Sequence, residues 1–195
     1  MIKFVIIGVV ILFIIIIFFW AKNSYNGMVV KEEVVVSQWA QVENVYQRRA
    51  DLIPNLVETV KGYATHENQT LTAVIEARAK ATQVTIDPTN LNEANMETFQ
   101  KAQSGLSSAL SRLMVSVEAY PDLKANQNFL NLQAQLETTE NGIKDERAKF
   151  NEVVKDFNMY VRKFPKNIFA SIFGFVQKAY FKAEEGANKA PKVKF

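Results

Sequence analysis

The stretch FVIIGVVILFIIIIFFW, residues 4–20, decides the fold, because its seventeen consecutive residues carry no charge and are almost all apolar. At a rise of ~1.5 Å per residue, a helix of this length covers roughly 26 Å, slightly less than a hydrocarbon core of about 30 Å. Ile2 and Ala21 lengthen the helix, and the Lys3 side chain can reach the headgroups. The stretch therefore predicts one membrane-spanning helix, and we assign residues 1–22 to a transmembrane anchor.

A cleaved signal peptide is the alternative interpretation of this stretch. The apolar region of such a peptide runs about 7–15 residues and ends at small residues. Here the run is longer, and Trp20 and Lys22 stand where small residues are needed. The chain has no cysteine, which excludes a lipoprotein signal. Trp20 and Tyr25 suit a membrane interface, because each ring combines an apolar body with a polar group. We therefore favour a retained anchor with membrane lipid as a partner.

The basic residues on the two sides of the anchor predict its orientation, although their numbers differ little. Lys3 and the α-amine precede the apolar run, and Lys22 and Lys31 follow it. A short head that bears a lysine is typical of a signal-anchor, which keeps the amino terminus inside and exports the domain that follows. We expect a single-pass protein with an extracytoplasmic bundle, and the opposite orientation is the alternative.

Apolar residues beyond the anchor recur at alternating steps of three and four, which places each set on one face of a helix. The first set is Val35, Trp39, Val42, Tyr46, Arg49, Ile53, Leu56, Val60 and Tyr63; the second is Leu106, Leu110, Leu113, Val117 and Tyr120; the third is Phe129, Leu132, Leu136, Thr139, Ile143, Glu146, Phe150, Val153, Phe157, Tyr160 and Phe164. A shorter helix is expected over residues 67–83. Glycine and proline are sparse, as this interpretation requires.

Turn signals separate these helices at residues 62–66, 87–90 and 120–122, and Pro165 ends the last one. We predict an all-α fold in which the transmembrane helix is followed by an elongated antiparallel four-helix, coiled-coil-like bundle and a short C-terminal amphipathic helix. Pro54 is expected to kink the first bundle helix.

The predicted domain organisation has four parts. Residues 1–22 form the anchor, residues 23–33 a membrane-proximal stalk, residues 34–164 the bundle, and residues 165–195 the amphipathic helix and tail. Asn23–Gly27 is expected to act as a hinge, because its composition is typical of turns.

Several blocks of the chain resemble one known family. These blocks are VYQRRADLIPNLVETVKGYATHE at 45–67, AVIEARAKA at 73–81, YPDLKANQNFLNLQAQLETTEN at 120–141, RAKFNEVVKDFN at 147–158 and YFKAEEGANKAPKVKF at 180–195. In these blocks the chain is similar to the LemA family of membrane-anchored bacterial proteins. The resemblance implies a helical bundle in the bacterial cytoplasmic (inner) membrane, as part of the cell envelope, with no established enzymatic activity. One relative takes part in shaping magnetosome membranes, which keeps membrane organisation among the hypotheses.

Each of the three sets given above forms a seam, the helix face expected to pack in the core. Two charged residues, Arg49 and Glu146, occupy seam positions that apolar residues otherwise hold. Burying an unpaired charge costs several kcal/mol, so each needs a partner. Candidate partners gather on the first and fourth bundle helices: Asn44, Asp51, Glu140 and Arg147. One interpretation is a ligand or partner site. The interpretation that we favour is a structural polar network that fixes helix register.

The residues of the chain do not form a recognisable catalytic motif. No Gly-x-Ser-x-Gly, Ser-x-x-Lys or glycine-rich phosphate loop occurs. His66 is the only histidine, so a structural zinc site cannot be assembled from histidine and cysteine. The net charge of +3 is dispersed and does not favour nucleic acid. We expect no catalytic residue, cofactor, metal, nucleic acid or small-molecule substrate.

The segment KNIFASIFGFVQKAYFK, residues 166–182, is basic, aromatic and apolar around more of a helix than one packing stripe needs. Its candidate contact residues for assembly or lipid are Phe169, Ile172, Phe173, Phe175, Tyr180 and Phe181. Three roles stay open: folding back on the bundle, contacting another subunit, or lying in a membrane interface.

Three functional hypotheses follow. The first is a non-enzymatic, membrane-anchored scaffold that self-associates as a homo-oligomer and organises membrane or envelope components. The second is an adaptor or regulator that recruits another membrane protein, such as a protease. The third, an enzyme or solute-binding module, has the least support from the residues.

Overall fold

The computed structural model describes residues 2–64 and 67–183 of the 195-residue chain. Within these ranges the chain forms helices and no strand, which confirms the predicted all-α class. The helices are α1 (Ile2–Lys61), α2 (Asn68–Gln83), α3 (Glu93–Val117), α4 (Pro121–Lys124), α5 (Gln127–Arg162) and α6 (Lys166–Phe173).

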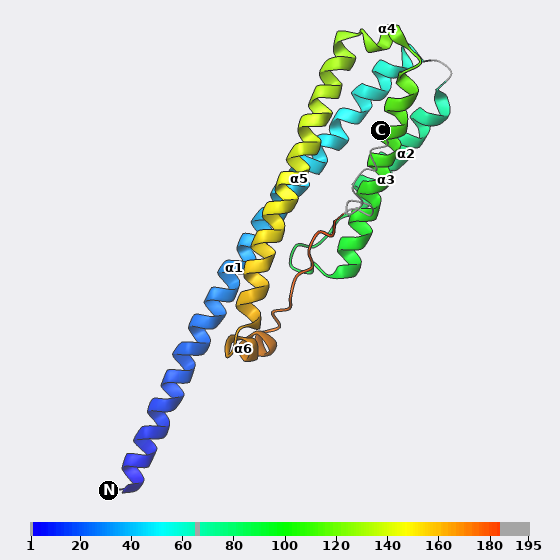
Figure 1. The fold of residues 1–195 in the computed structure, drawn as a ribbon. Helices are drawn as coiled ribbons and strands as arrows, with labels where there is room; N and C mark the ends of the chain where they lie inside the picture. Colours follow the sequence, from blue (N-terminus) through cyan, green and yellow to red (C-terminus); the bar gives the residue numbers. More distant parts are fainter. Residues whose placement is uncertain (1, 65–66, 184–195) are drawn as a thin grey trace, which may run out of the picture.

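Two helix pairs make up the bundle (Figure 1). The long helices α1 and α5 run antiparallel and pack along most of α5, while α2 and α3 form a shorter hairpin beside the distal half of α1. The short helix α4 joins α3 to α5 at the distal end, and α6 lies at the opposite end, where α5 stops.

Helix α1 contains both the apolar run that is long enough to span a membrane and the central helix of the bundle. Its 60 residues continue without a break through residues 23–33, so the expected hinge at Asn23–Gly27 is wrong. The reason lies at Gly27, where a β-carbon would overlap the Tyr160 hydroxyl and lie 2.7 Å from Cζ of the same ring. Gly27 therefore permits close packing of α5 on a straight helix and does not form a turn.

The predicted seams supply most of the core, although the residues at the ends of the first and third sets, Tyr63 and Phe164, are exposed. Eight of the nine residues in the first set are buried, from Val35 to Val60, and only Tyr63 is exposed. The buried residues fall into two apolar clusters. The membrane-proximal cluster includes Trp39, Phe99, Phe150 and Phe157. The distal cluster includes Leu56, Leu106, Leu113 and Phe129.

Pro54 lies inside α1 without ending it. Because proline has no backbone N–H, the carbonyl of Ala50 loses the helical bond that it would accept four residues later. Arg78 of α2 replaces that donor: its Nε donates to the Ala50 carbonyl at 2.7 Å. Ala50 is a buried residue, so the guanidinium supplies a donor to a carbonyl with little access to water.

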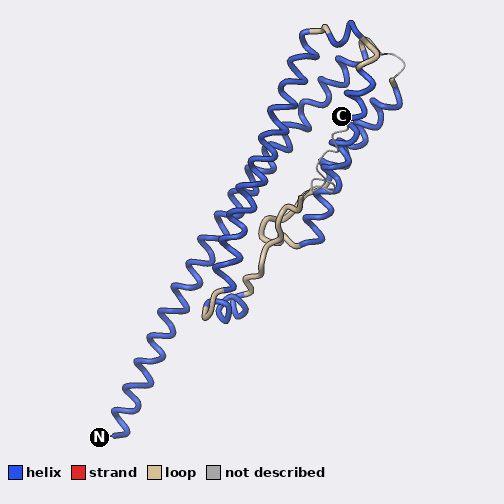
Figure 2. The backbone as a smooth tube through the Cα atoms, viewed as in Figure 1, coloured by secondary structure: helices blue, strands red, loops and turns tan. Residues whose placement is uncertain are grey.

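The C-terminal amphipathic helix is shorter than the 166–182 segment predicted for it. Helix α6 ends at Phe173, because Gly174 adopts a left-handed conformation with φ of 78°. Residues 174–183, which we call the C-terminal strap, then run as a loop back along α5 towards α3 (Figure 2). Residues 184–195 of the predicted tail lie outside the described residues.

Candidate functional site

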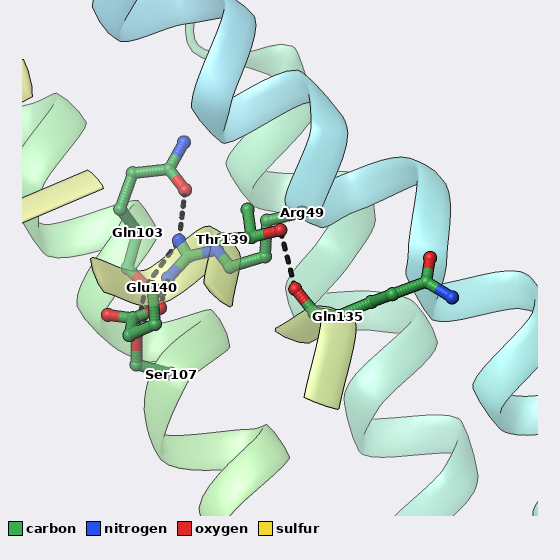
Figure 3. A network of polar contacts seen from close by, with 6 residues as sticks. All are labelled: Arg49, Gln103, Ser107, Gln135, Thr139 and Glu140. Carbon is green, nitrogen blue, oxygen red and sulfur yellow. Dashed lines mark hydrogen bonds and ion pairs between the residues drawn. The ribbon is translucent and has the colours of Figure 1, made fainter. Parts of the chain in front are cut away.

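Arg49 is the centre of a polar network in the bundle (Figure 3). Its side chain is 2% exposed. Nη1 donates to Glu140 Oε2 and to Ser107 Oγ, both at 3.0 Å, and Nη2 donates to Gln103 Oε1 at 2.6 Å. The Tyr46 ring lies 5.2 Å from the guanidinium carbon. The buried cation is thus paired with one carboxylate and with neutral acceptors from α3, as a buried charge requires.

The network lies at the boundary between the two apolar clusters. In α1, Tyr46 belongs to the membrane-proximal cluster and Ile53 to the distal cluster, and Arg49 lies between them. A single polar layer of this kind favours one alignment of helices, because a shift of register would leave the guanidinium unpaired. This position supports the structural interpretation of Arg49 and Glu140.

Glu146, six residues after Glu140 on α5, forms a separate site. Its carboxylate accepts from Gln38 of α1 at 2.6 Å and pairs with Lys149 at 2.7 Å. The hydrogen bond from Lys149, with a further contribution from Gln38, lowers the pKa of Glu146 below its ordinary value, and partial burial opposes this shift. Glu146 therefore stays ionised although it occupies a seam position.

The remaining predicted members do not join Arg49. Asn44 and Asp51 are exposed, and Asp51 accepts from Gln47 on its own helix at 2.7 Å. Arg147 donates to the Lys182 carbonyl at 3.0 Å and covers the Phe181 ring. The sequence reasoning missed Gln103 and Ser107, because it considered only the first and fourth bundle helices as sources of partners.

Two asparagines of α5 hold the C-terminal strap. The Asn158 side chain donates to the Lys178 carbonyl and accepts from the Lys178 N–H, and Asn151 does the same for Phe181. Asn151 and Asn158 are seven helical residues apart, a rise of about 10.5 Å along α5. Lys178 and Phe181 are three extended residues apart, about 10 Å along the strap, so the two distances match. The strap therefore runs antiparallel to α5, and its backbone groups at Lys178 and Phe181 bond to the two asparagine side chains.

Lys178 is the second buried cation. Its side chain is 2% exposed, and Nζ lies 2.6 Å from Glu32 Oε1 of α1 and donates to the Thr89 carbonyl. This ion pair attaches the strap to α1, and Ala179 donates its N–H to the Leu91 carbonyl. No sequence motif signalled the pairing, because Glu32 and Lys178 stand at opposite ends of the chain.

The membrane-proximal end carries the predicted aromatic residues. Trp20 lies 6.2 Å from Phe169, and Tyr25 lies 5.0 Å from Phe173 and 5.8 Å from Phe175 between ring centroids. Ile172 and Tyr180 are exposed, whereas Phe181 is 5% exposed and packs against Trp39 and Phe150. Phe181 therefore packs inside its own bundle, which is the first of the three roles left open for this segment.

The described residues offer no assembled reaction centre. Among residues 2–64 and 67–183, no group of three or more His, Asp or Glu side chains could hold a metal ion. His66 lies outside these ranges. A groove between α3 and α5 opens on Arg49 and is bordered by Leu110, Met114 and Leu136. The donors that Arg49 directs there are already bonded to Glu140 and Ser107.

These features define a class of helical-bundle proteins with one N-terminal apolar helix that is long enough to act as a membrane anchor. The LemA family model matches residues 38–195. The chain therefore belongs to the LemA family.

Curated relatives agree with this assignment. The chain is 25% identical to protein LemA of Metamycoplasma hominis, over 94% of this chain and 80% of that protein. It is also 25% identical to magnetosome protein MamQ 2 of Paramagnetospirillum magneticum and to magnetosome protein MamQ of Magnetospirillum gryphiswaldense, in each case over 87% of this chain and 68% of the relative.

Proposed function

We propose that the protein is a non-enzymatic, membrane-anchored scaffold of the bacterial cell envelope that self-associates and organises membrane components. The observation that carries this proposal is a group of exposed valines on α1, beyond the apolar run and on the same unbroken helix. Val29, Val30 and Val34 are 41%, 63% and 48% exposed within the described structure. Apolar residues left uncovered on a rigid rod are suited to contact between copies.

Three further findings support the proposal. The most polar buried residues, Arg49 and Lys178, bond to groups within the bundle and so stabilise it. The chain belongs to the LemA family, and the MamQ relatives reported above are named magnetosome proteins. Membrane confinement adds to association, because two anchored copies meet at a far higher effective concentration than two free ones.

In this proposal the protein crosses the cytoplasmic membrane once, through the apolar run of α1. The bundle lies on the extracytoplasmic side in this proposal, because Lys3 precedes the apolar run as a basic residue does in a signal-anchor.

Mass photometry of the full-length protein in detergent tests self-association. We expect particles larger than one chain, and Val30→Lys with Val34→Lys should shift them towards monomers. Ser37→Lys with Gln41→Lys is the matched control, because these exposed residues lie on the same face of α1 seven residues further along. A wild-type protein that is monomeric in detergent and in lipid nanodiscs would contradict the scaffold.

Crosslinking in native membranes separates the scaffold from the adaptor. A scaffold gives crosslinks between copies of this chain. Recovery of a different membrane protein in fixed stoichiometry, without such crosslinks, would instead support recruitment of a partner.

A further inference from the structure

Helix α6 lies at the level where α1 leaves its apolar run. Phe169 contacts Trp20, the last residue of that run, and Phe173 contacts Tyr25. The rise along α1 from Trp20 to Tyr25 is about 7.5 Å, similar to the roughly 5–7 Å of each headgroup layer. If α1 spans the bilayer, α6 is therefore held at headgroup depth beside it (Figure 1).

One face of α6 is apolar and uncovered in the described structure. Ile168 and Ile172, which we call the apolar stripe, are 49% and 68% exposed. A spacing of four residues places both side chains on one side of α6. Phe164, in the turn before the helix, is 80% exposed. Asn167 and Ser171, each one residue before an isoleucine of the stripe, are exposed and polar. The two exposed faces of the helix thus differ sharply in polarity.

Basic residues surround this stripe, and acidic residues are absent from it. Residues 157–183 contain no Asp or Glu, and neither do residues 1–31. Lys22, Arg162 and Lys163 are exposed. Lys166 lies over the Tyr160 ring, with Nζ 3.6 Å from its centroid. The charge of this end therefore complements an anionic surface.

We propose that α6 is a second membrane contact, an interfacial helix that inserts Ile168 and Ile172 among lipid chains, together with Phe164 of the preceding turn, while the basic residues bind anionic lipid headgroups. Lipid is the occupant that the structure favours, because Phe169 of the same helix contacts Trp20 at the end of the anchor, which holds α6 at the depth of the headgroups. This inference rests on the membrane anchoring of the proposed function and does not require self-association.

Spin labelling of the full-length chain tests the position of α6, and the chain suits it because it has no native cysteine. Ile172→Cys and Ser171→Cys are compared after nitroxide labelling in vesicles of equal parts phosphatidylglycerol and phosphatidylcholine. We expect the label at 172 to be several times more accessible to oxygen relative to a water-soluble nickel chelate than the label at 171. Circular dichroism checks that both variants fold.

Each other outcome overturns the inference. Equal exposure of both labels to nickel would place α6 in water. Exclusion of both oxygen and nickel from residue 172 would show that protein, such as a second copy, covers the stripe. Mass photometry separates the two proposals: a monomer with a lipid-exposed label at 172 contradicts the scaffold alone, and an oligomer with a water-exposed label contradicts only this inference.

The headgroup preference has its own measurement. In vesicles of phosphatidylcholine alone, the oxygen preference at residue 172 should fall. Lys163→Gln with Lys166→Gln should produce the same fall in the mixed vesicles. A preference that is unchanged by either treatment would contradict the anionic-lipid part of the proposal.

Discussion

At Gly27 the missing side chain makes room for the phenol ring of Tyr160, because a β-carbon there would overlap the Tyr160 hydroxyl. The Tyr160 ring also lies beneath the ammonium groups of Lys166, at 3.6 Å, and Lys31, at 5.7 Å. This residue pair therefore joins α1, α5 and the start of α6 just beyond the membrane.

Gly27→Ala should destabilise the protein, although alanine is the better helix former. Alanine in place of glycine inside a helix usually gains about 0.5–1 kcal/mol, but overlap with a packed ring costs about 1–3 kcal/mol and decides the sign. Gly105→Ala is the control, because nothing lies within 4 Å of its added β-carbon. Urea unfolding in detergent should show a lower free energy of unfolding for Gly27→Ala and a higher one for Gly105→Ala. Equal stabilisation by both substitutions would contradict the packing role of Gly27.

Loss of Glu140 should cost more than loss of Arg49. Glu140→Gln leaves a cation that is 2% exposed without its counter-charge, whereas Arg49→Met leaves a carboxylate that is 39% exposed and can be hydrated. We expect about 3 kcal/mol for Glu140→Gln and a smaller loss for Arg49→Met in urea unfolding. If Glu140→Gln abolished function in cells without changing stability, the groove at Arg49 would be a binding site.

Glu146 should make stability depend on pH in the acid range. Its lowered pKa means that its contribution is fully present above the ordinary value of about 4.3 and is lost as pH falls through the lower folded value. Glu146→Gln should therefore be less stable than wild type at pH 7, and the two should converge at low pH. Lys149→Met removes the main cause of the pKa shift, so in this background Glu146→Gln should change the free energy of unfolding by less. Unfolding free energies of wild type and Glu146→Gln that run parallel over the whole pH range would contradict the contribution of ionised Glu146.

At the scale of elements, α1 and α2 are connected by a bond that replaces one lost to proline. Arg78→Met keeps most of the side-chain stem but leaves the buried Ala50 carbonyl unsatisfied, at a cost of about 1–3 kcal/mol. In a Pro54→Ala background, the restored N–H at residue 54 can bond to that carbonyl, so Arg78→Met should cost much less. A double-mutant cycle measured by urea unfolding tests this coupling. Additive effects would contradict it.

The helices were predictable where side-chain spacing alone determines burial. The seam from Val35 to Val60 needed only the period of a helix. Residues 23–27 were not, because a glycine beside an asparagine is typical of a turn, and only the Tyr160 ring across the interface explains its place in a helix. The length of α6 was also missed, because the sequence pattern ignored the left-handed conformation available to Gly174.

The candidate sites were predictable only in part, for the same reason. Charges on seam positions signalled that Arg49 and Glu146 needed partners, and Glu140 was among the expected ones. Partners on α3 and in the strap depend on which helix lies opposite, and a helical period does not contain that information. Asn151 and Asn158 appear in the sequence as ordinary polar residues, although each bonds the strap backbone at two points.

At the scale of the whole molecule, the C-terminal strap returns to the first helix of the chain. The strap reaches α1 through the pair between Lys178 and Glu32, so the C-terminal segment stabilises the helix that carries the anchor. The membrane-proximal end of the bundle is therefore fixed from three directions: by α5, by α6 and by the strap.

The side of the membrane that holds the bundle is testable with a single cysteine. Ser108→Cys, exposed on α3, should react with a membrane-impermeant maleimide in intact cells, because the proposed topology exports the bundle. Gly8→Cys, within the apolar run, is the control and should stay unlabelled even after permeabilisation. Labelling of Ser108→Cys only after permeabilisation would place the bundle in the cytoplasm.

An uninterrupted α1 also makes the protein a lever. Its residues beyond the anchor extend about 60 Å from the bilayer surface, so a tilt of about 10° in the lipid would swing the far tip by about 10 Å. Local thinning or curvature of the bilayer would thus be amplified into lateral movement at α4, far from where it arose.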